Sequence, residues 1–87
     1  CLNDRVAMGT YQALADQGLV VPDDVSVVSF DGSQLADWLR PSVTSVALPF
    51  VELGRRAAKL LLDPARDQSG NVLVPMHLTH GTSIREA

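Results

Sequence analysis

Apolar residues recur with helical spacing in two stretches of the chain. In the first stretch, Ala7, Tyr11 and Leu14 lie at positions i, i+4 and i+7, which predicts a helix over residues 4–17. In the second stretch, a similar apolar stripe predicts a helix over residues 51–62. That stripe consists of Leu53, Ala57, Leu60 and Leu61.

Other stretches have the composition of β-strands. Residues 25–30 are β-branched and mostly apolar, which is typical of a strand buried on both faces of a parallel sheet. Residues 44–48 predict a second short strand, and residues 72–79 predict a strand-like run that Pro75 divides in two. Residues 34–39 predict one short turn of helix between the first two strands.

The predicted order is helix, strand, short helix, strand, helix, strand. Strands separated by helices of about a dozen residues are typical of parallel βαβ units with right-handed crossovers. We therefore expect an α/β fold with a Rossmann-like parallel sheet. Only Cys1 and Leu2 precede the first helix, where the same logic expects a complete strand. The sheet is thus expected to be partial, and the chain to be a fragment.

Composition and charge limit the classes of protein to which the chain can belong. The 87 residues are 46% hydrophobic and 20% charged, which fits one small globular domain or a piece of one. The net charge is −3 and the seven Lys and Arg residues are scattered, so the chain by itself is not expected to bind DNA. Apolar runs reach only three residues, which excludes a membrane span. Cys1 is the only cysteine, which excludes an internal disulfide.

Two predicted corners of the sheet carry polar residues suited to a ligand. Asn3 and Asp4 lie where a strand would end and the first helix begins, and Asp31 follows the apolar strand. Ligands of open α/β sheets bind beyond the carboxyl ends of strands. An amide and a carboxylate there can bond the neighbouring hydroxyls of a sugar. The structural alternative is that Asn3 only caps the helix and Asp31 only forms a turn.

Catalytic, metal and cofactor sites are not indicated. His77 and His80 tend toward opposite faces of one strand, and the single cysteine is distant, so no metal site is expected. Ser26, Ser29 and Ser33 lie near an aspartate but lack the Gly-x-Ser-x-Gly motif of a hydrolase. No phosphate-binding glycine loop is present. We expect no cofactor and no catalytic activity.

Four motifs follow one another along the chain. They are Asn-Asp-Arg-Val-Ala-Met-Gly at residues 3–9, Val-Pro-Asp-Asp-Val-Ser-Val-Val-Ser-Phe-Asp at 21–31, Pro-Ser-Val-Thr-Ser-Val at 41–46 and Leu-Gly-Arg-Arg-Ala-Ala at 53–58. In this order and at these spacings they resemble the LacI/GalR family of bacterial transcription regulators. The resemblance covers nearly the whole chain.

The resemblance implies a fold and a function. It implies the C-terminal part of a periplasmic-binding-protein-like effector-binding core, with residues 1–46 in the C-terminal subdomain. Residues 47–74 would cross to the other subdomain and supply a helix there, and residues 75–87 would form the return strand and the tail. The family's DNA-binding domain is absent from this sequence, so operator DNA would be contacted only through that domain.

In such a cytoplasmic repressor, a small sugar-like ligand controls operator binding by a homodimer, without a cofactor and without a membrane. The alternative is a periplasmic or lipid-anchored sugar-binding protein of a transport system, with Cys1 as the lipid-bearing residue.

Site residues follow from the resemblance by position. Asn3 and Asp31 match family residues that face the effector, and Phe50 matches an aromatic or apolar residue near the cleft, on which a sugar could pack. A cluster around Trp38 is expected either in the local core or in the family's dimer interface. The residues expected in that interface are Met8, Gln12, Leu35, Trp38 and Leu39.

Three positions depart from the family pattern. Ser29 stands where the family usually has glycine, and Gly32 stands where it often has a second acid. Gly32 therefore removes one possible hydrogen-bond acceptor from the expected site. His80 stands where the family often has arginine.

Overall fold

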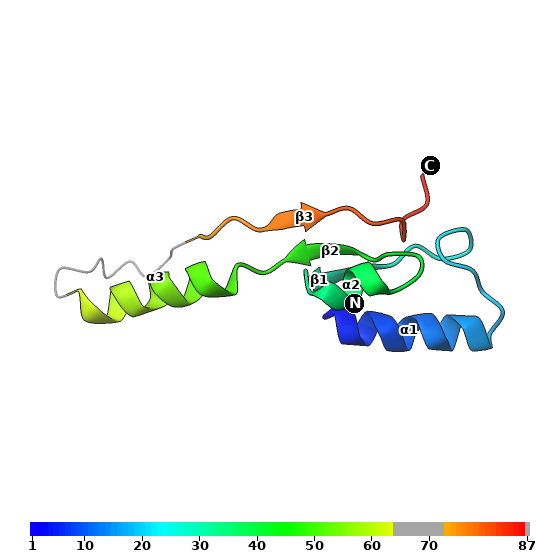
Figure 1. Cartoon of the computed structure of the whole chain (residues 1–87), viewed down its shortest axis with the longest axis horizontal. Coiled ribbons are helices and arrows are strands. Elements are labelled where there is room, and N and C mark those ends of the chain that lie inside the picture. Colours follow the sequence, from blue (N-terminus) through cyan, green and yellow to red (C-terminus); the bar gives the residue numbers. More distant parts are fainter. Residues whose placement is uncertain (64–72, 87) are drawn as a thin grey trace.

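The computed structural model describes residues 1–63 and 73–86 (Figure 1). Helices and strands follow one another in the predicted order, and their ends differ from the predicted ones by three residues or fewer, except in the last strand. The elements are α1 (Asp4–Asp16), β1 (Val28–Asp31), α2 (Gln34–Trp38), β2 (Thr44–Ala47), α3 (Phe50–Leu62) and β3 (His77–Thr79).

The three strands form one sheet in the order β1-β2-β3. β1 and β2 are parallel, with Phe30 beside Val46, which confirms the predicted βαβ unit. β2 and β3 are antiparallel, with Val46 beside Leu78, so the expectation of parallel strands throughout was wrong. The reason is the path of the chain: it leaves the sheet through β2, passes through α3 and comes back alongside β2 (Figure 1).

One face of the sheet is covered by helices. α1 contacts β1 and α2, and the side chain of Ser29 in the middle of β1 is buried on this side. Val28 and Phe30 point to the other face and are 42% and 43% exposed. The expectation that this strand is buried on both faces was therefore wrong for the described residues, because no helix among them packs on the second face.

The predicted strand-like run at residues 72–79 forms a strand only in its second half. Leu73 and Val74 are not in a strand, and Val72 lies outside the described residues. Pro75 precedes β3 and has no amide hydrogen to contribute to a sheet, which explains why pairing starts only at His77. No helix in residues 1–63 or 73–86 has the length and apolarity needed to cross a membrane.

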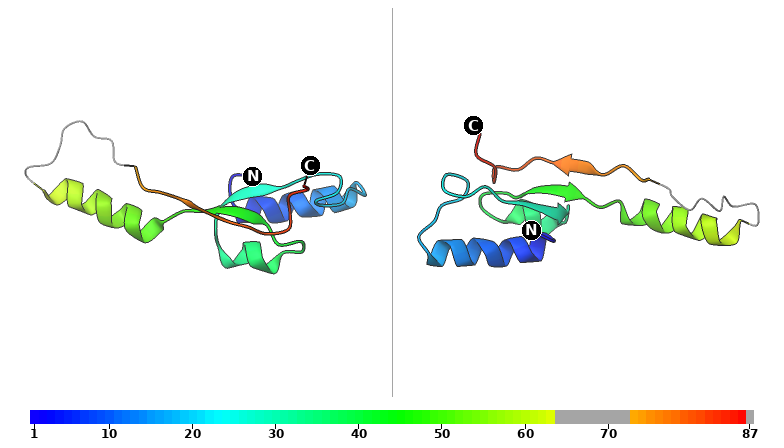
Figure 2. Two further views of the ribbon diagram at one scale, coloured as in Figure 1. Left: turned by 90° about the horizontal axis from the view of Figure 1, so that it is seen from above. Right: turned by 180° about the vertical axis from the view of Figure 1, so that it is seen from behind.

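The core is small and lies between α1, α2 and the sheet. Its buried members are Ala7, Val27, Ala36 and Val43. The described residues extend over 57 × 24 × 18 Å with a radius of gyration of 17.1 Å, against about 12 Å for a compact chain of this length. The difference arises from α3, which has no buried residue and projects away from the sheet and the other two helices (Figure 2).

The segment after β3 is fastened to the sheet by Ser83, whose side chain is fully buried. Its hydroxyl donates to the carbonyl of Val27 at 2.5 Å and accepts from the amide of Thr44 at 2.8 Å. The hydroxyl of Tyr11 in α1 donates to the carbonyl of Pro41 at 2.8 Å, and burial of this side chain raises the pKa of Tyr11. These bonds hold the amino ends of β1 and β2 in place. Asp31 lies at the opposite end of the sheet.

Candidate functional site

Asn3 begins the first corner of the site. It is the N-cap of α1, in an extended conformation, and its Oδ1 accepts a hydrogen bond from the amide of Val6 at 2.9 Å. Asn3 therefore caps the helix, as the structural alternative to a ligand role expected. The cap uses Oδ1 only, so the side-chain amide group of this half-buried residue takes no part in it.

Asp31 forms the second corner, at the carboxyl end of β1. Its φ is 130°, a region that residues other than glycine rarely adopt and that costs on the order of 1–3 kcal/mol. Its carbonyl accepts from the amide of Leu48 at 3.3 Å, which holds the end of β1 against the chain that leaves β2. The side chain is half-buried. Strain of this kind persists only where the surroundings hold the backbone in place, and it is frequent at ligand sites.

Asp4, expected beside Asn3 at the first corner, joins the two corners, which the sequence did not predict. It is the first residue of α1 and is fully buried. Its Oδ1 accepts from the hydroxyls of Ser29 and of Ser45, the latter at 2.9 Å. Its Oδ2 accepts from the amide of Ser33 at 2.8 Å and from the hydroxyl of the same residue at 2.6 Å. One carboxylate therefore links α1, β1, β2 and the loop before α2.

Asp4 is ionised without a cationic partner. Burial alone would raise its pKa, but the hydrogen bonds from Ser29, Ser33 and Ser45 together outweigh this effect and hold the pKa below its ordinary value. The ion pairs found in residues 1–63 and 73–86 do not involve it. Its place at the amino end of a helix adds a favourable dipole. Four hydrogen bonds thus replace the counter-ion.

Gly32 fits tightly against β2. Its φ is 69°, and a Cβ at this position would lie 2.7 Å from both Cα and Cβ of Ala47. Its amide donates to the hydroxyl of Ser45 at 2.9 Å. A side chain at this position, including the second acid expected from the family pattern, would therefore require β2 to move.

Phe50 follows the end of the sheet at which Asp31 lies. Asp31 pairs with Ala47 at the end of the parallel strands, and Phe50 follows Ala47 by three residues as the first residue of α3. Its side chain is 60% exposed. Asn3, Asp31 and Phe50 are thus placed where α1 starts, where β1 ends and where the chain leaves β2.

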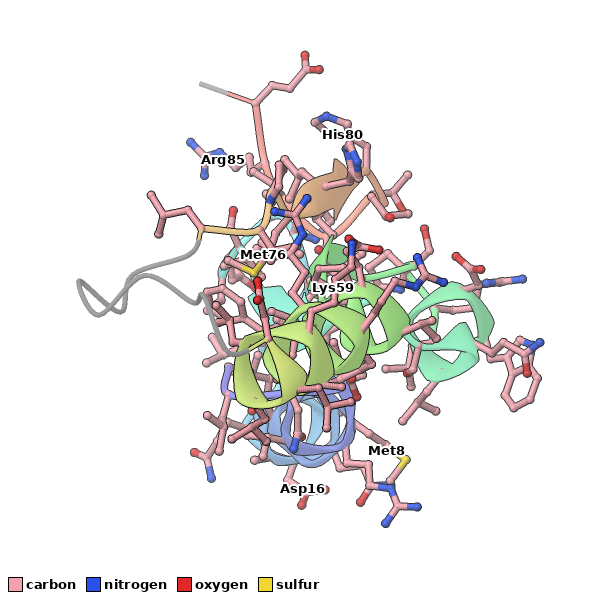
Figure 3. All side chains as sticks on the ribbon, turned by 90° about the vertical axis from the view of Figure 1, so that its left-hand side faces the viewer. Met8, Asp16, Lys59, Met76, His80 and Arg85 are labelled. Atoms are coloured by element: carbon pink, nitrogen blue, oxygen red, sulfur yellow. The ribbon has the colours of Figure 1, made fainter. Side chains whose placement is uncertain are left out.

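The residues expected in a dimer interface lie on α1 and α2, which contact each other, and on the residue that ends α2. Trp38 is 69% exposed, so the alternative that it belongs to the local core is wrong for the described residues. Met8 and Gln12 are exposed on α1, and Met8 projects on the side away from β3 (Figure 3). Leu35 is half-buried, and Leu39 packs against the core.

α3 carries a separate charged surface. Glu52 forms ion pairs with Arg55 at 2.8 Å and with Arg56 at 2.9 Å, and the bond from Arg56 lowers the pKa of Glu52. The two arginines are exposed and Glu52 is half-buried, and together with Lys59 they line a shallow hollow of about 300 Å³ along the helix. None of the residues predicted from the sequence to bind a ligand lines this hollow.

No set of three or more His, Cys, Asp or Glu side chains that could hold a metal ion occurs in the described part of the chain. The serines near Asp31 have a different use: the hydroxyls of Ser29 and Ser33 donate to Asp4. The sequence did contain a signal for this network. Ser29 and Ser45 are polar residues at inward positions of short strands, and buried hydroxyls require a partner.

Comparison with known proteins identifies the family of the chain. The family of the periplasmic binding protein-like domain matches residues 1–84. The chain is 37% identical to the ribose operon repressor of Haemophilus influenzae over 82% of its own length. It is 38% identical to the HTH-type transcriptional repressor CytR of Escherichia coli over 98% of its length. The chain covers only 21% and 26% of these two relatives.

A solved structure agrees with this assignment. The LacI family transcriptional regulator CCPA from Weissella paramesenteroides, with bound sucrose, superposes with a TM-score of 0.81 and 36% identity. The match covers 95% of this chain and 30% of that regulator. The predicted α/β fold, as a fragment of a periplasmic-binding-protein-like core, is thereby confirmed. The chain belongs to the periplasmic binding protein-like domain family, in the form that LacI-type transcriptional regulators carry.

Proposed function

We propose that this chain is the C-terminal part of the effector-sensing and dimerising core of a LacI-type repressor, and that its effector is a small sugar-like molecule. The observation that carries the proposal is the link between Asn3 and Asp31: both corners are built on the buried carboxylate of Asp4. Solved relatives hold sucrose, glucose and ribose, which supports a sugar as ligand class.

The chemistry of the corner suits a sugar. The carboxylate of Asp31 accepts hydrogen bonds from two neighbouring hydroxyls, and the side-chain amide of Asn3 donates to a ring or hydroxyl oxygen. The exposed ring of Phe50 offers an apolar surface to the C–H face of the ligand. These residues bind and orient a ligand and supply no nucleophile, so we propose that the chain has no catalytic activity.

The division of the chain follows its path. Residues 1–46 form part of the C-terminal subdomain, residues 47–74 cross to the second subdomain, and residues 75–87 return to the first. The projection of α3 away from the sheet and the antiparallel return of β3 support this division. A separate domain contacts operator DNA, as the names of the HTH-type relatives suggest, and the net charge of −3 does not favour binding of phosphates by these residues. The repressor acts in the cytoplasm.

The dimer forms through α1 and α2, with Met8, Gln12, Leu35, Trp38 and Leu39 in the interface. The exposure of Trp38 and the contact between α1 and α2 support this surface. Effector binding shifts the population of two arrangements of the subdomains, and the dimer transmits the shift to the DNA-binding domains. The relatives are repressors and not transport proteins, so the transport alternative has no support from them.

Calorimetric titration of the complete regulator with ribose, glucose and sucrose tests the proposal. Asp31→Ala is expected to weaken binding at least about tenfold, because hydrogen bonds to a charged group are worth roughly 1.5–3 kcal/mol. Asp16→Ala removes an exposed acid from the end of α1 and is the matched control. Equal affinity of wild type and Asp31→Ala for a bound sugar would remove Asp31 from the site.

A further inference from the structure

We propose that Asp4 is a positioning residue of the effector site: through Ser33 and Ser45 it fixes the backbone that carries Asp31 and ties this corner to Asn3. The inference rests on the proposed function, because it takes Asn3 and Asp31 to contact the effector. It adds a residue that would not touch the ligand and would still set its affinity.

The first step is the double contact with Ser33. Its amide and its hydroxyl both donate to Oδ2 of Asp4, at 2.8 and 2.6 Å, and two bonds to one atom fix both the place and the orientation of the residue. Ser33 is also the N-cap of α2, where a serine normally bonds the helix with its own hydroxyl. It makes no such side-chain bond here. Its hydroxyl donates a hydrogen bond to Asp4 and does not cap the helix.

The second step is the contact through Ser45. The hydroxyl of Ser45 donates to Oδ1 of Asp4 at 2.9 Å and accepts from the amide of Gly32 at 2.9 Å. Gly32 and Ser33 are the two residues that follow Asp31, so both are held to one carboxylate. In the same peptide unit as the Gly32 amide, the carbonyl of Asp31 accepts from the amide of Leu48. These bonds hold the backbone that directly follows Asp31, whose φ is 130°.

The third step is the link to the other corner. Asp4 directly follows Asn3, and its burial leaves it no freedom to move without the start of α1. The hydroxyl of Ser29, two residues before Asp31, also donates to Asp4. The carboxylate thus has contacts before and after Asp31 and is covalently joined to Asn3, so the spacing between the two corners depends on it.

The test uses the complete regulator and two measurements, namely hydrogen exchange of the segment 29–36 by mass spectrometry and calorimetric titration with ribose, glucose and sucrose. Ser33→Ala is expected to exchange faster in this segment and to bind at least about tenfold more weakly. Ser33→Thr, which keeps the hydroxyl, is expected to restore both. Ser42→Ala removes a serine at the opposite end of the sheet and is expected to change neither. Asp4→Asn is expected to act as Ser33→Ala does.

A second background separates this inference from the proposed function. In Asp31→Asn, Ser33→Ala is expected to cause a smaller further loss of affinity, because the charged group that Ser33 positions is gone. An equal loss in both backgrounds, or unchanged exchange in Ser33→Ala, would overturn the positioning role alone. Unchanged affinity of Asp31→Asn for a bound sugar would overturn the proposed site and this inference with it. If none of the three sugars binds, the exchange measurement decides: an unchanged segment overturns the role of Asp4.

Discussion

The hydroxyl of Ser33 donates a hydrogen bond to Oδ2 of Asp4 at 2.6 Å, although 29 residues separate the two in the chain. A fully buried carboxylate therefore depends on neutral donors for its stability. It is sensitive to pH, because protonation removes the charge that these hydrogen bonds stabilise.

The first prediction concerns the loss of stability at low pH. The folded pKa of Asp4 is lowered from its ordinary value of 3.8, so the unfolded chain binds this proton more readily than the folded chain. The stabilisation is fully present above that ordinary value and is lost as the pH falls through the folded pKa. Asp4→Asn is expected to lack this part of the pH dependence. Urea midpoints across the acid range, compared with those of Asp16→Asn, measure it; parallel curves for wild type and Asp4→Asn would contradict the prediction.

The second prediction concerns the strained backbone of Asp31. Asp31→Gly relieves the φ of 130°, whereas Asp31→Ala keeps the strain, and both remove the carboxylate. The glycine variant is expected to be more stable than the alanine variant by about 1 kcal/mol, and both are expected to bind effector weakly. Thermal unfolding and sugar titration check the two parts separately. A glycine variant less stable than the alanine variant would show that the backbone carries no strain.

The third prediction compares two glycines to separate the cost of a positive φ from the cost of a steric clash. Gly18 and Gly32 have φ values of 72° and 69°, but only at Gly32 would a Cβ meet other atoms, namely those of Ala47 at 2.7 Å. Gly18→Ala is expected to cost about 1 kcal/mol of unfolding free energy. Gly32→Ala is expected to cost about 1–3 kcal/mol more, because β2 has to move. Denaturant titration measures the free energy of unfolding of both variants. Equal losses would mean that β2 moves away from residue 32 at no cost.

The chain order of helices and strands was predictable because each element has its own local pattern. The helix over residues 51–62 illustrates this, since its apolar stripe is visible without any partner. The direction of β3 was not predictable in the same way, because it depends on where the chain turns back and not on the residues His77–Thr79 themselves. The exposed face with Val28 and Phe30 has a similar cause: apolar composition indicates what a strand can bury and not which neighbours are present.

Asn3 and Asp31 could be selected from the sequence because Asn3 lies where a strand would end and Asp31 follows a predicted strand. Their placement at two corners built on one carboxylate could not, because it depends on contacts between residues 29 to 41 positions apart in the chain. Asp4 has the same residue type as many surface acids in this chain. Only the serines around it in space distinguish it, and those come from three separate stretches.

The fourth prediction concerns association. Trp38 is 69% exposed on α2 and is expected to anchor the dimer, where removal of a central tryptophan typically costs 2 kcal/mol or more. Trp38→Ala is therefore expected to weaken the dimer of the complete regulator at least about thirtyfold. Val20→Ala, in the loop after α1, changes another exposed apolar residue and serves as control. Sedimentation velocity over a dilution series measures the change, and an unaltered dissociation constant would exclude this surface.

The way in which β2 and β3 lead to and from α3 has a mechanical consequence. A lobe attached by one peptide segment can swivel about it, but here two segments run side by side and are bonded in register at Val46 with Leu78 and at Ala47 with His77. Twisting such a pair would shear its hydrogen bonds, whereas bending it across its flat side would not. We therefore expect the joint between the sheet and α3 to resist twisting more than bending, because the two paired strands of the sheet lie directly before and after it in the fold.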